Sequence, residues 1–356
     1  MTKIAILSFY SGIVERGVET YVFELSCRLA KKNRVTIFQA GTPKPFQKFK
    51  TTHVKFFASA PKSAKGFLAK VYLDWQSLKI LGFSIKSIPK FLAGKYQVVI
   101  GTNGGWQTVI YRILTKITGA KIIIPGGAGI GSDDAANLLA RPDVFVALTT
   151  PQTVWAKRLA PEVRVETIPN GVDLSRFQPK IKPKDIGLPK PIVICTAALV
   201  PYKRIDLTIK AVAKTKNLSL LLLGDGELKG QIDGLGKRFL GARFKRLVVP
   251  YQEVPSYYKA GKVFTLASET EAFGTSYIEA MACNLPVVTT SDDSRAEIIG
   301  DAGILTDPKN LGEYAKDLEL AAKTDYKNKP YTQSLKFSWN KIAQRYHDLI
   351  SEIIRS

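Results

Sequence analysis

Short apolar segments with strand character alternate with helical segments along this chain, and the alternation runs through twice. In the first half, KIAILSFY is followed by VETYVFELSCRLAKK, whose apolar residues recur at helical spacing. Strands that are joined through helices pair in parallel, and the helices cover both faces of the sheet. We therefore predict an α/β domain whose further strands are RVTIFQA and the segments 96–102, 120–126 and 143–149.

The alternation restarts after a proline-rich stretch. The turn Asn170-Gly171 and the prolines between Phe177 and Pro191 indicate a linker there. We predict residues 1–178 as an N-terminal Rossmann-like domain, 179–335 as a second such domain, and 336–356 as an amphipathic helix that packs back toward the first. Two doubly wound domains are expected to face each other across a cleft that binds a substrate.

The charge of the chain is high and uneven. The net charge is +22, and residues 31–95 hold 14 basic residues and a single acid, Asp74. Such a field attracts nucleic acid, anionic lipid or phosphorylated substrates. Two histidines and three cysteines without a CxxC spacing argue against zinc sites and histidine-based triads. Without a signal-like start or a long apolar window, a cytoplasmic protein is expected.

The segment EAFGTSYIE has the pattern best suited to anion chemistry. An apolar strand delivers Glu271 in a loop, Gly274 permits a tight turn, and a helix begins near Thr275. The amides of Phe273, Gly274 and Thr275 would point at an anion at that helix start. Glu279 can accept hydrogen bonds from ribose hydroxyls, and Glu271 from sugar hydroxyls. By spacing alone, two such glutamates are more often solvated surface groups.

The same segment resembles the Glu-x7-Glu motif of glycosyltransferase family 4, a family of retaining enzymes also described as glycosyl transferases group 1. The family pattern E-x-F-G-x-x-x-x-E-A-M-A-x-x-x-P-V-V matches residues 271–288 position by position. The resemblance implies an α/β chain with the GT-B fold, that is, two doubly wound Rossmann-like domains facing across a cleft. It extends over nearly the whole chain through VETYVFELSCRLAKKNRVTIF, IPNGVD, ALVPYKRIDLTIKAV, LLLGDGEL and AEIIGDAGILTDP.

The resemblance also implies roles for individual residues. Lys203 would place its ammonium against the leaving diphosphate, and Glu271 would act with it as the second catalytic residue. Gly17 would let main-chain amides approach the same phosphates. The full set of implied donor-binding residues is Gly17, Arg204, Gly224, Gly226, Phe273, Gly274, Thr275 and Glu279.

The chain departs from the family pattern at several positions. Many members carry an arginine five residues before the lysine, where this chain has Ala198. Arg204 offers a replacement, although its adjacent position directs the side chain elsewhere. Arg16 stands in place of the first glycine of the N-terminal pair, and no histidine lies near residues 124–131. A non-catalytic GT-B-like protein that binds a nucleotide sugar or a glycan is therefore kept as the alternative.

The implied reaction is a retaining, front-face transfer from a UDP-sugar or GDP-sugar, without cofactor or metal. The departing phosphate oxygen takes the acceptor proton, and the protein positions the reactants and stabilises the leaving charge. The expected partners are the nucleotide-sugar donor and a saccharide or lipid-linked acceptor of the cell envelope. A nucleic-acid-binding protein would explain the charge but not the Glu-x7-Glu segment, and no nucleic-acid partner is predicted.

The segment 61–95 interleaves lysines with apolar side chains. Basic and aromatic helices lie well on an anionic membrane, so we hypothesise that this segment docks the domain on the cytoplasmic face of a membrane. The alternative is an ordinary core stripe with a lysine-rich outer face. The apolar residues concerned are Phe67, Leu68, Tyr72, Trp75, Leu78, Phe83 and Phe91.

Overall fold

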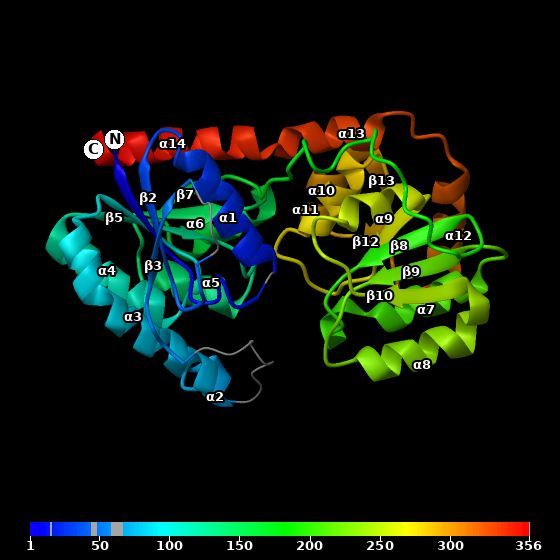
Figure 1. The fold of residues 1–356 in the computed structure, drawn as a ribbon, viewed down its shortest axis with the longest axis horizontal. Coiled ribbons are helices and arrows are strands. Elements are labelled where there is room, and N and C mark those ends of the chain that lie inside the picture. The colour runs from blue at the N-terminus through cyan, green and yellow to red at the C-terminus, as the bar shows by residue number, and fades with distance from the viewer. Residues whose placement is uncertain (15, 44–47, 58–66, 356) are drawn as a thin grey trace. The chain divides into compact units, whose positions relative to one another are not determined.

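The computed structural model describes residues 1–14, 16–43, 48–57 and 67–355 (Figure 1). Within them the chain forms two compact units. The first unit consists of Met1–Asn170 together with Trp339–Ser356, and the second of Gly171–Ser338. The sequence placed these divisions slightly differently, after residues 178 and 335.

The first unit is built on a seven-stranded parallel sheet with the order β3-β2-β1-β4-β5-β6-β7. Its strands are β1 (Lys3–Leu7), β2 (Arg34–Gln39), β3 (Lys50–His53), β4 (Val98–Gly101), β5 (Lys121–Pro125), β6 (Val144–Ala147) and β7 (Arg164–Thr167). Its helices are α1 (Gly17–Leu29), α2 (Phe67–Lys70), α3 (Trp75–Gly94), α4 (Trp106–Thr118), α5 (Ser132–Leu139), α6 (Thr150–Leu159) and α14 (Trp339–Arg355).

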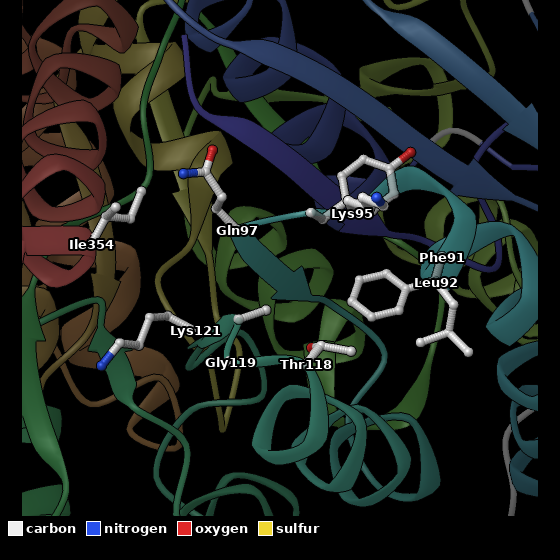
Figure 2. A pocket seen from close by; sticks show the side chains of 10 residues that line it. Phe91, Leu92, Lys95, Gln97, Thr118, Gly119, Lys121 and Ile354 are labelled. Carbon is white, nitrogen blue, oxygen red and sulfur yellow. The ribbon is translucent and has the colours of Figure 1, made fainter.

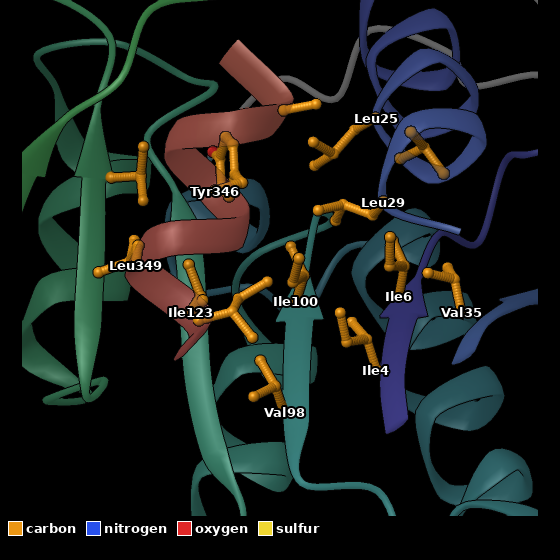
Figure 3. Close-up of a cluster of buried hydrophobic side chains, with 14 of the residues drawn as sticks. Ile4, Ile6, Leu25, Leu29, Val35, Val98, Ile100, Ile123, Tyr346 and Leu349 are labelled. Atoms are coloured by element: carbon orange, nitrogen blue, oxygen red, sulfur yellow. The ribbon is translucent and has the colours of Figure 1, made fainter. Parts of the chain in front are cut away.

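The interior strand β1 is apolar on both faces, because helices cover both sides of the sheet. Successive side chains of a strand point to opposite faces, so Ile4 and Ile6 enter one core and Ala5 and Leu7 the other. The core that contains Ile6 is closed by α1 and by the C-terminal helix α14 (Figure 3). The hydroxyl groups of Tyr21 and Tyr346, one from each helix, lie 2.8 Å apart within it.

One side of helix α3 packs into the core on the second face of the sheet, the core that contains Ala5 and Leu7. Phe83 and Phe91 are buried there, and the ring of Phe91 packs edge-on against Tyr111 of α4 at 5.1 Å. The hypothesis that the whole apolar set of residues 61–95 faces a membrane is therefore wrong for these two phenylalanines. Lys62 and Lys65 of that segment lie outside the described residues. In the described ranges, no helix combines the length and the apolar character that crossing a bilayer requires.

The second unit contains a six-stranded parallel sheet with the order β10-β9-β8-β11-β12-β13. Its strands are β8 (Ile192–Thr196), β9 (Ser219–Leu223), β10 (Phe244–Leu247), β11 (Val263–Leu266), β12 (Val287–Thr290) and β13 (Gly303–Thr306). Its helices are α7 (Ile205–Lys214), α8 (Lys229–Leu240), α9 (Val254–Ala260), α10 (Thr275–Ala282), α11 (Asp293–Ile299), α12 (Leu311–Lys323) and α13 (Lys329–Ser334).

Strand β8 occupies the middle of this second sheet. The chain proceeds outward from β8 to β9 and β10, returns to β11 on the other side of β8, and continues outward to β12 and β13. The loops that follow β8 and β11 therefore leave the sheet in opposite directions. Such a switch point is where open α/β sheets bind ligands, outside the carboxyl ends of the strands.

Candidate active site

The predicted catalytic pair lies at the switch point of the second unit. Lys203 ends a short 3₁₀ turn, Pro201–Lys203, that follows β8, and Glu271 lies in the loop that follows β11. The ammonium of Lys203 donates a hydrogen bond of 2.5 Å to Oε1 of Glu271. Because only 14% of the Lys203 side chain and 11% of the Glu271 side chain are exposed, water screens this pair poorly.

Main-chain contacts fix the two loops to each other. The amide of Glu269 donates to the carbonyl oxygen of Tyr202 at 2.8 Å, and the Ser268 hydroxyl donates to the same carbonyl oxygen at 3.4 Å. These bonds hold Glu271 opposite Lys203 without demanding any particular side chain at Tyr202. The site thus offers a cation for a phosphate and a carboxylate for hydroxyl groups, side by side.

Arg204, which follows Lys203, points into a different environment. Its backbone is in the left-handed region at φ 47°. The guanidinium donates to Asp206 at 3.1 Å and to Glu269 at 2.7 Å. These hydrogen bonds to carboxylates raise the pKa of Arg204 further above its usual range. In this structure the guanidinium of Arg204 is bound by two carboxylates. The predicted contact of Arg204 with a donor diphosphate stays a prediction.

Gly224 and Gly226 shape the loop after β9. A Cβ at Gly224 would lie 1.9 Å from the carbonyl oxygen of Ala197, and one at Gly226 would lie 2.6 Å from that of Leu199. The amide of Leu199 donates to the carbonyl of Asp225 at 2.9 Å, so the two segments run in contact. The glycines therefore allow the β9 loop to approach the chain that leads to Lys203. Direct contact of these glycines with a donor stays a prediction.

The next three predicted residues lie just before α10 and at its first position. Gly274 precedes the helix at φ 83°, and a Cβ there would lie 2.2 Å from the ring of Tyr277. Phe273 is buried, and its ring packs edge-on against Phe337 at 5.6 Å. Only the main chain of Phe273 is therefore available to a ligand. Thr275 is the first residue of α10, as the sequence predicts.

Glu279 is held by two tyrosines that the sequence did not indicate. The hydroxyl of Tyr251 donates to Oε1 of Glu279 at 2.6 Å, and the hydroxyl of Tyr258 donates to Oε2 at 3.4 Å. The glutamate is only 6% exposed. Burial and the nearby charge of Glu279 raise the pKa of Tyr258 well above its usual value, so its hydroxyl remains a donor. The carboxylate is thus oriented and suited to accept hydrogen bonds from ribose hydroxyls.

Residues 177–334, which make up most of the second unit, match the family model described as Glycosyl transferases group 1. The match covers 158 of the 356 residues, and the family assignment is made for this part of the chain. The match includes the eight-residue helix α10 and both members of the Lys203–Glu271 pair. The predicted resemblance is thereby confirmed.

Several relatives of this chain are glycosyltransferases or mannosyltransferases by name. D-inositol 3-phosphate glycosyltransferase 2 of Catenulispora acidiphila is 27% identical over 99% of this chain and 95% of its own length. O-antigen chain mannosyltransferase B of Escherichia coli is 32% identical over 26% of this chain. That match spans 25% of the mannosyltransferase, so the chain covers only about a quarter of this relative.

Solved structures share the fold at low sequence identity. Sucrose-phosphate synthase from Thermosynechococcus elongatus matches with a TM-score of 0.81 and 18% identity, over 100% of both chains. Anabaena Alr3699/HepE, in complex with UDP and glucose, matches with a TM-score of 0.76 and 20% identity, over 99% of this chain and 100% of that one. The predicted α/β class with two Rossmann-like domains of the GT-B fold is confirmed.

An arginine that the sequence analysis missed supports the loop of Glu271. Arg295 of α11 is buried, and its guanidinium donates to the carbonyl of Ser268 at 2.8 Å and to the Tyr277 hydroxyl at 3.3 Å. It also pairs with Asp292. The carboxylate of Asp292 accepts from the amide of Arg295 at 2.8 Å and so caps the start of α11. No local pattern distinguishes Arg295 from a surface residue.

Gly17 lies in the first unit, whereas the other nine predicted residues lie in the second. It is the first residue of α1, and a Cβ placed on it would meet no atom within 4 Å. The neighbouring Arg16 pairs with Glu19 at 2.9 Å, and its guanidinium lies 4.9 Å from the ring centre of Tyr10. The open space around Gly17 leaves its main chain accessible. Its predicted approach to the donor phosphates stays a prediction.

Proposed function

We propose that this chain transfers a sugar from a nucleotide-diphosphate sugar to a hydroxyl acceptor. The observation that carries the proposal is the Lys203–Glu271 pair at the switch point. Like this pair, the oriented carboxylate of Glu279 comes from the chain that follows the carboxyl ends of β8 and β11. A nucleotide sugar needs these three functions together: a cation for the diphosphate, an acceptor for ribose hydroxyls and a carboxylate for the sugar. The match of residues 177–334 to the glycosyl transferases group 1 supports the same reaction class.

We assign the roles as follows. Lys203 stabilises the negative charge that develops on the departing diphosphate, where low exposure strengthens the interaction. Glu279 binds the ribose, and Glu271 orients the sugar hydroxyls while holding Lys203 in place. In a retaining, front-face reaction the bond from the anomeric carbon to the phosphate oxygen breaks as the acceptor oxygen bonds to the same face. The acceptor proton passes to that phosphate oxygen, so no protein base, metal or cofactor is required.

We further propose an acceptor that is lipid-linked or belongs to the cell envelope. The names of relatives support this class, among them a phosphatidylinositol monomannoside mannosyltransferase of Mycolicibacterium smegmatis, 26% identical over 43% of this chain and 46% of its own length. The net charge of +22 supports association with an anionic membrane. UDP-sugars and GDP-sugars are both candidate donors, because Alr3699/HepE forms a complex with UDP-glucose and the Mycolicibacterium relative is GDP-mannose-dependent by name.

The competing function is nucleotide-sugar binding without transfer. It is favoured by Ala198, which stands where many family members carry an arginine, and by the engagement of Arg204 with Asp206 and Glu269. Lys203 would then be the cation left to hold the diphosphate. The two functions differ in a measurable way, because both predict donor binding and only one predicts turnover.

A donor panel tests the proposal. UDP-, GDP- and ADP-sugars are screened by thermal shift, and donor hydrolysis is then measured with the best binder. We expect Lys203→Ala and Glu279→Ala each to abolish the shift or the turnover, whereas Lys237→Ala on the exposed side of α8 should change neither. Wild-type behaviour of both site variants would refute the site, and binding without any turnover would favour the non-catalytic function.

A further inference from the structure

Helix α4 of the first unit exposes an apolar stripe that the core does not use. Val109, Ile113 and Ile117 recur every four residues, so they lie along one side of the helix. Ile113 is 56% exposed and Ile117 is 76% exposed. The opposite side of α4 is buried through Tyr111. An exposed row of isoleucine and valine on a helix marks an interaction site when it joins other apolar groups.

The neighbouring helix α3 continues this surface. Leu78, Ile85 and Leu92 recur every seven residues and are exposed. The two helices pack against each other, since the Ser87 hydroxyl of α3 lies 2.6 Å from the Tyr111 hydroxyl of α4 (Figure 1). Their outward sides together form what we term the α3–α4 face, made of Leu78, Ile85, Leu92, Val109, Ile113 and Ile117.

Lysines surround this apolar face. Lys86, Lys95 and Lys116 lie on the same two helices or at their ends, and all three are exposed. Within the described part of the chain, none of these three makes an ion pair. Residues 31–132 contain 17 lysines and arginines and one acid, Asp74, whose carboxylate caps the start of α3. The face thus combines exposed hydrocarbon with positive charge that nearby acids do not neutralise.

We infer that the α3–α4 face docks this chain on the surface of an anionic lipid membrane. Apolar side chains enter the boundary of the acyl chains, and the lysines bind the lipid phosphates around them. The inference deepens the membrane association in the proposed function and rests on that part of it, not on sugar transfer. It moves the contact from the whole segment 61–95 to the outer sides of α3 and α4, since Phe83 and Phe91 are core residues.

A cavity of about 510 Å³ at the end of the face has matching chemistry (Figure 2). It lies at the amino ends of β4 and β5, next to Gln97 and Ala120, so it is separate from the carboxyl edge of that sheet. Phe91, Leu92 and Ile354 supply apolar lining, and Lys95 and Lys121 supply ammonium groups. Leu92 belongs to both the face and the cavity, and Lys95 is one of the lysines that surround the face, so a lipid phosphate with its first methylene groups fits this lining.

The charge argues against a second copy of this chain as the occupant. Two copies joined through the α3–α4 face would bring their lysines together without acids to compensate, which is unfavourable for association. A dimer through this face is nevertheless a distinct outcome of the experiment, because it would bury the same isoleucines.

Vesicle flotation of the full chain tests the inference, with phosphatidylcholine vesicles that contain or lack phosphatidylglycerol. We expect wild type to float only with the anionic vesicles and to be released by high salt. Two variants should each lower the partition coefficient at least about tenfold. One is the double variant Ile113→Gln/Ile117→Gln, and the other is the triple variant Lys86→Gln/Lys95→Gln/Lys116→Gln. Both sets alter exposed side chains, and thermal unfolding checks that each variant is folded.

Matched controls lie on the second unit. Leu320→Gln on α12 removes an exposed leucine, and Lys237→Gln/Lys316→Gln removes exposed charge from α8 and α12. These variants should float like wild type. The inference would be overturned if wild type did not bind anionic vesicles, or if the face variants floated as well as wild type. It would also be overturned if light scattering showed a dimer that only the face variants abolish. Donor binding is measured on the same samples, so loss of donor binding with intact flotation would count against sugar transfer alone.

Discussion

The ammonium of Lys203 and the carboxylate of Glu271 form an ion pair of 2.5 Å although 68 residues separate them in the chain. They meet because β8 and β11 are neighbours in the sheet, with Phe264 opposite Ile194. A poorly exposed lysine without a partner would be costly, and the glutamate compensates its charge while no donor is bound. A donor diphosphate would then share the ammonium with Glu271 or displace it.

Changing Glu271 to glutamine separates the two roles of this carboxylate. Glu271→Gln keeps the size of the side chain and removes its charge, so Lys203 is left more available to a diphosphate. We expect donor affinity, measured by calorimetry, to stay equal or rise, and turnover to fall about 10²-fold because the sugar hydroxyls and Lys203 lose the carboxylate that positions them. Glu269→Gln, which changes the neighbouring partner of Arg204, should leave turnover within about threefold. Unchanged turnover in Glu271→Gln would contradict the catalytic assignment.

The engagement of Arg204 by Asp206 and Glu269 predicts a small effect of removing it. Arg204→Gln should leave donor affinity within about threefold of wild type, because the guanidinium is bound elsewhere. The stability change should stay below about 1 kcal/mol, since the group is partly exposed. Fluorescence titration with the donor and urea unfolding give the two values. A loss of affinity as large as that of Lys203→Ala would show that Arg204 swings onto the diphosphate.

The hydrogen bond from Tyr251 to Glu279 predicts a selective effect on donor binding. Tyr251→Phe removes the hydroxyl that orients Oε1, so the KM for the donor should rise about threefold to tenfold while kcat stays within about twofold. Tyr257→Phe is the matched control: the Tyr257 ring lies 5.8 Å from the Lys184 ammonium and is kept by phenylalanine, so neither constant should change. Equal changes of kcat and KM in both variants would indicate a general structural effect.

Two glycines of the second unit should respond in opposite ways to alanine. Gly224→Ala places a Cβ 1.9 Å from a carbonyl oxygen, so we expect a loss of about 1–3 kcal/mol in the free energy of unfolding. Gly234 lies inside α8, and a Cβ added there would meet no atom within 4 Å. Gly234→Ala should therefore raise the free energy of unfolding by about 0.5–1 kcal/mol. Urea denaturation measures both. If Gly224→Ala left the free energy of unfolding unchanged, the loop after β9 would adapt to the added Cβ and would not fix the position of the chain that leads to Lys203.

The candidate site was predictable where its chemistry is local in sequence. Glu271, Gly274 and Glu279 fall within one loop and the first turns of one helix, and a family pattern covers them. The supporting residues Tyr251, Tyr258 and Arg295 were not predictable, because each reaches the motif from a different element of the fold. An ordinary tyrosine or arginine shows no sequence signal for a contact that folding alone creates.

The sequence by itself determined the two α/β units, their parallel strands and the local Glu-x7-Glu turn, because hydrophobic periodicity and glycine positions act over a few residues. Only the tertiary structure decided which apolar residues of α3 enter the core, that Arg204 binds Asp206 and Glu269, and that Lys203 meets Glu271. The physical reason is that strand order and helix packing set these distances, and neither is encoded in the spacing of any single segment.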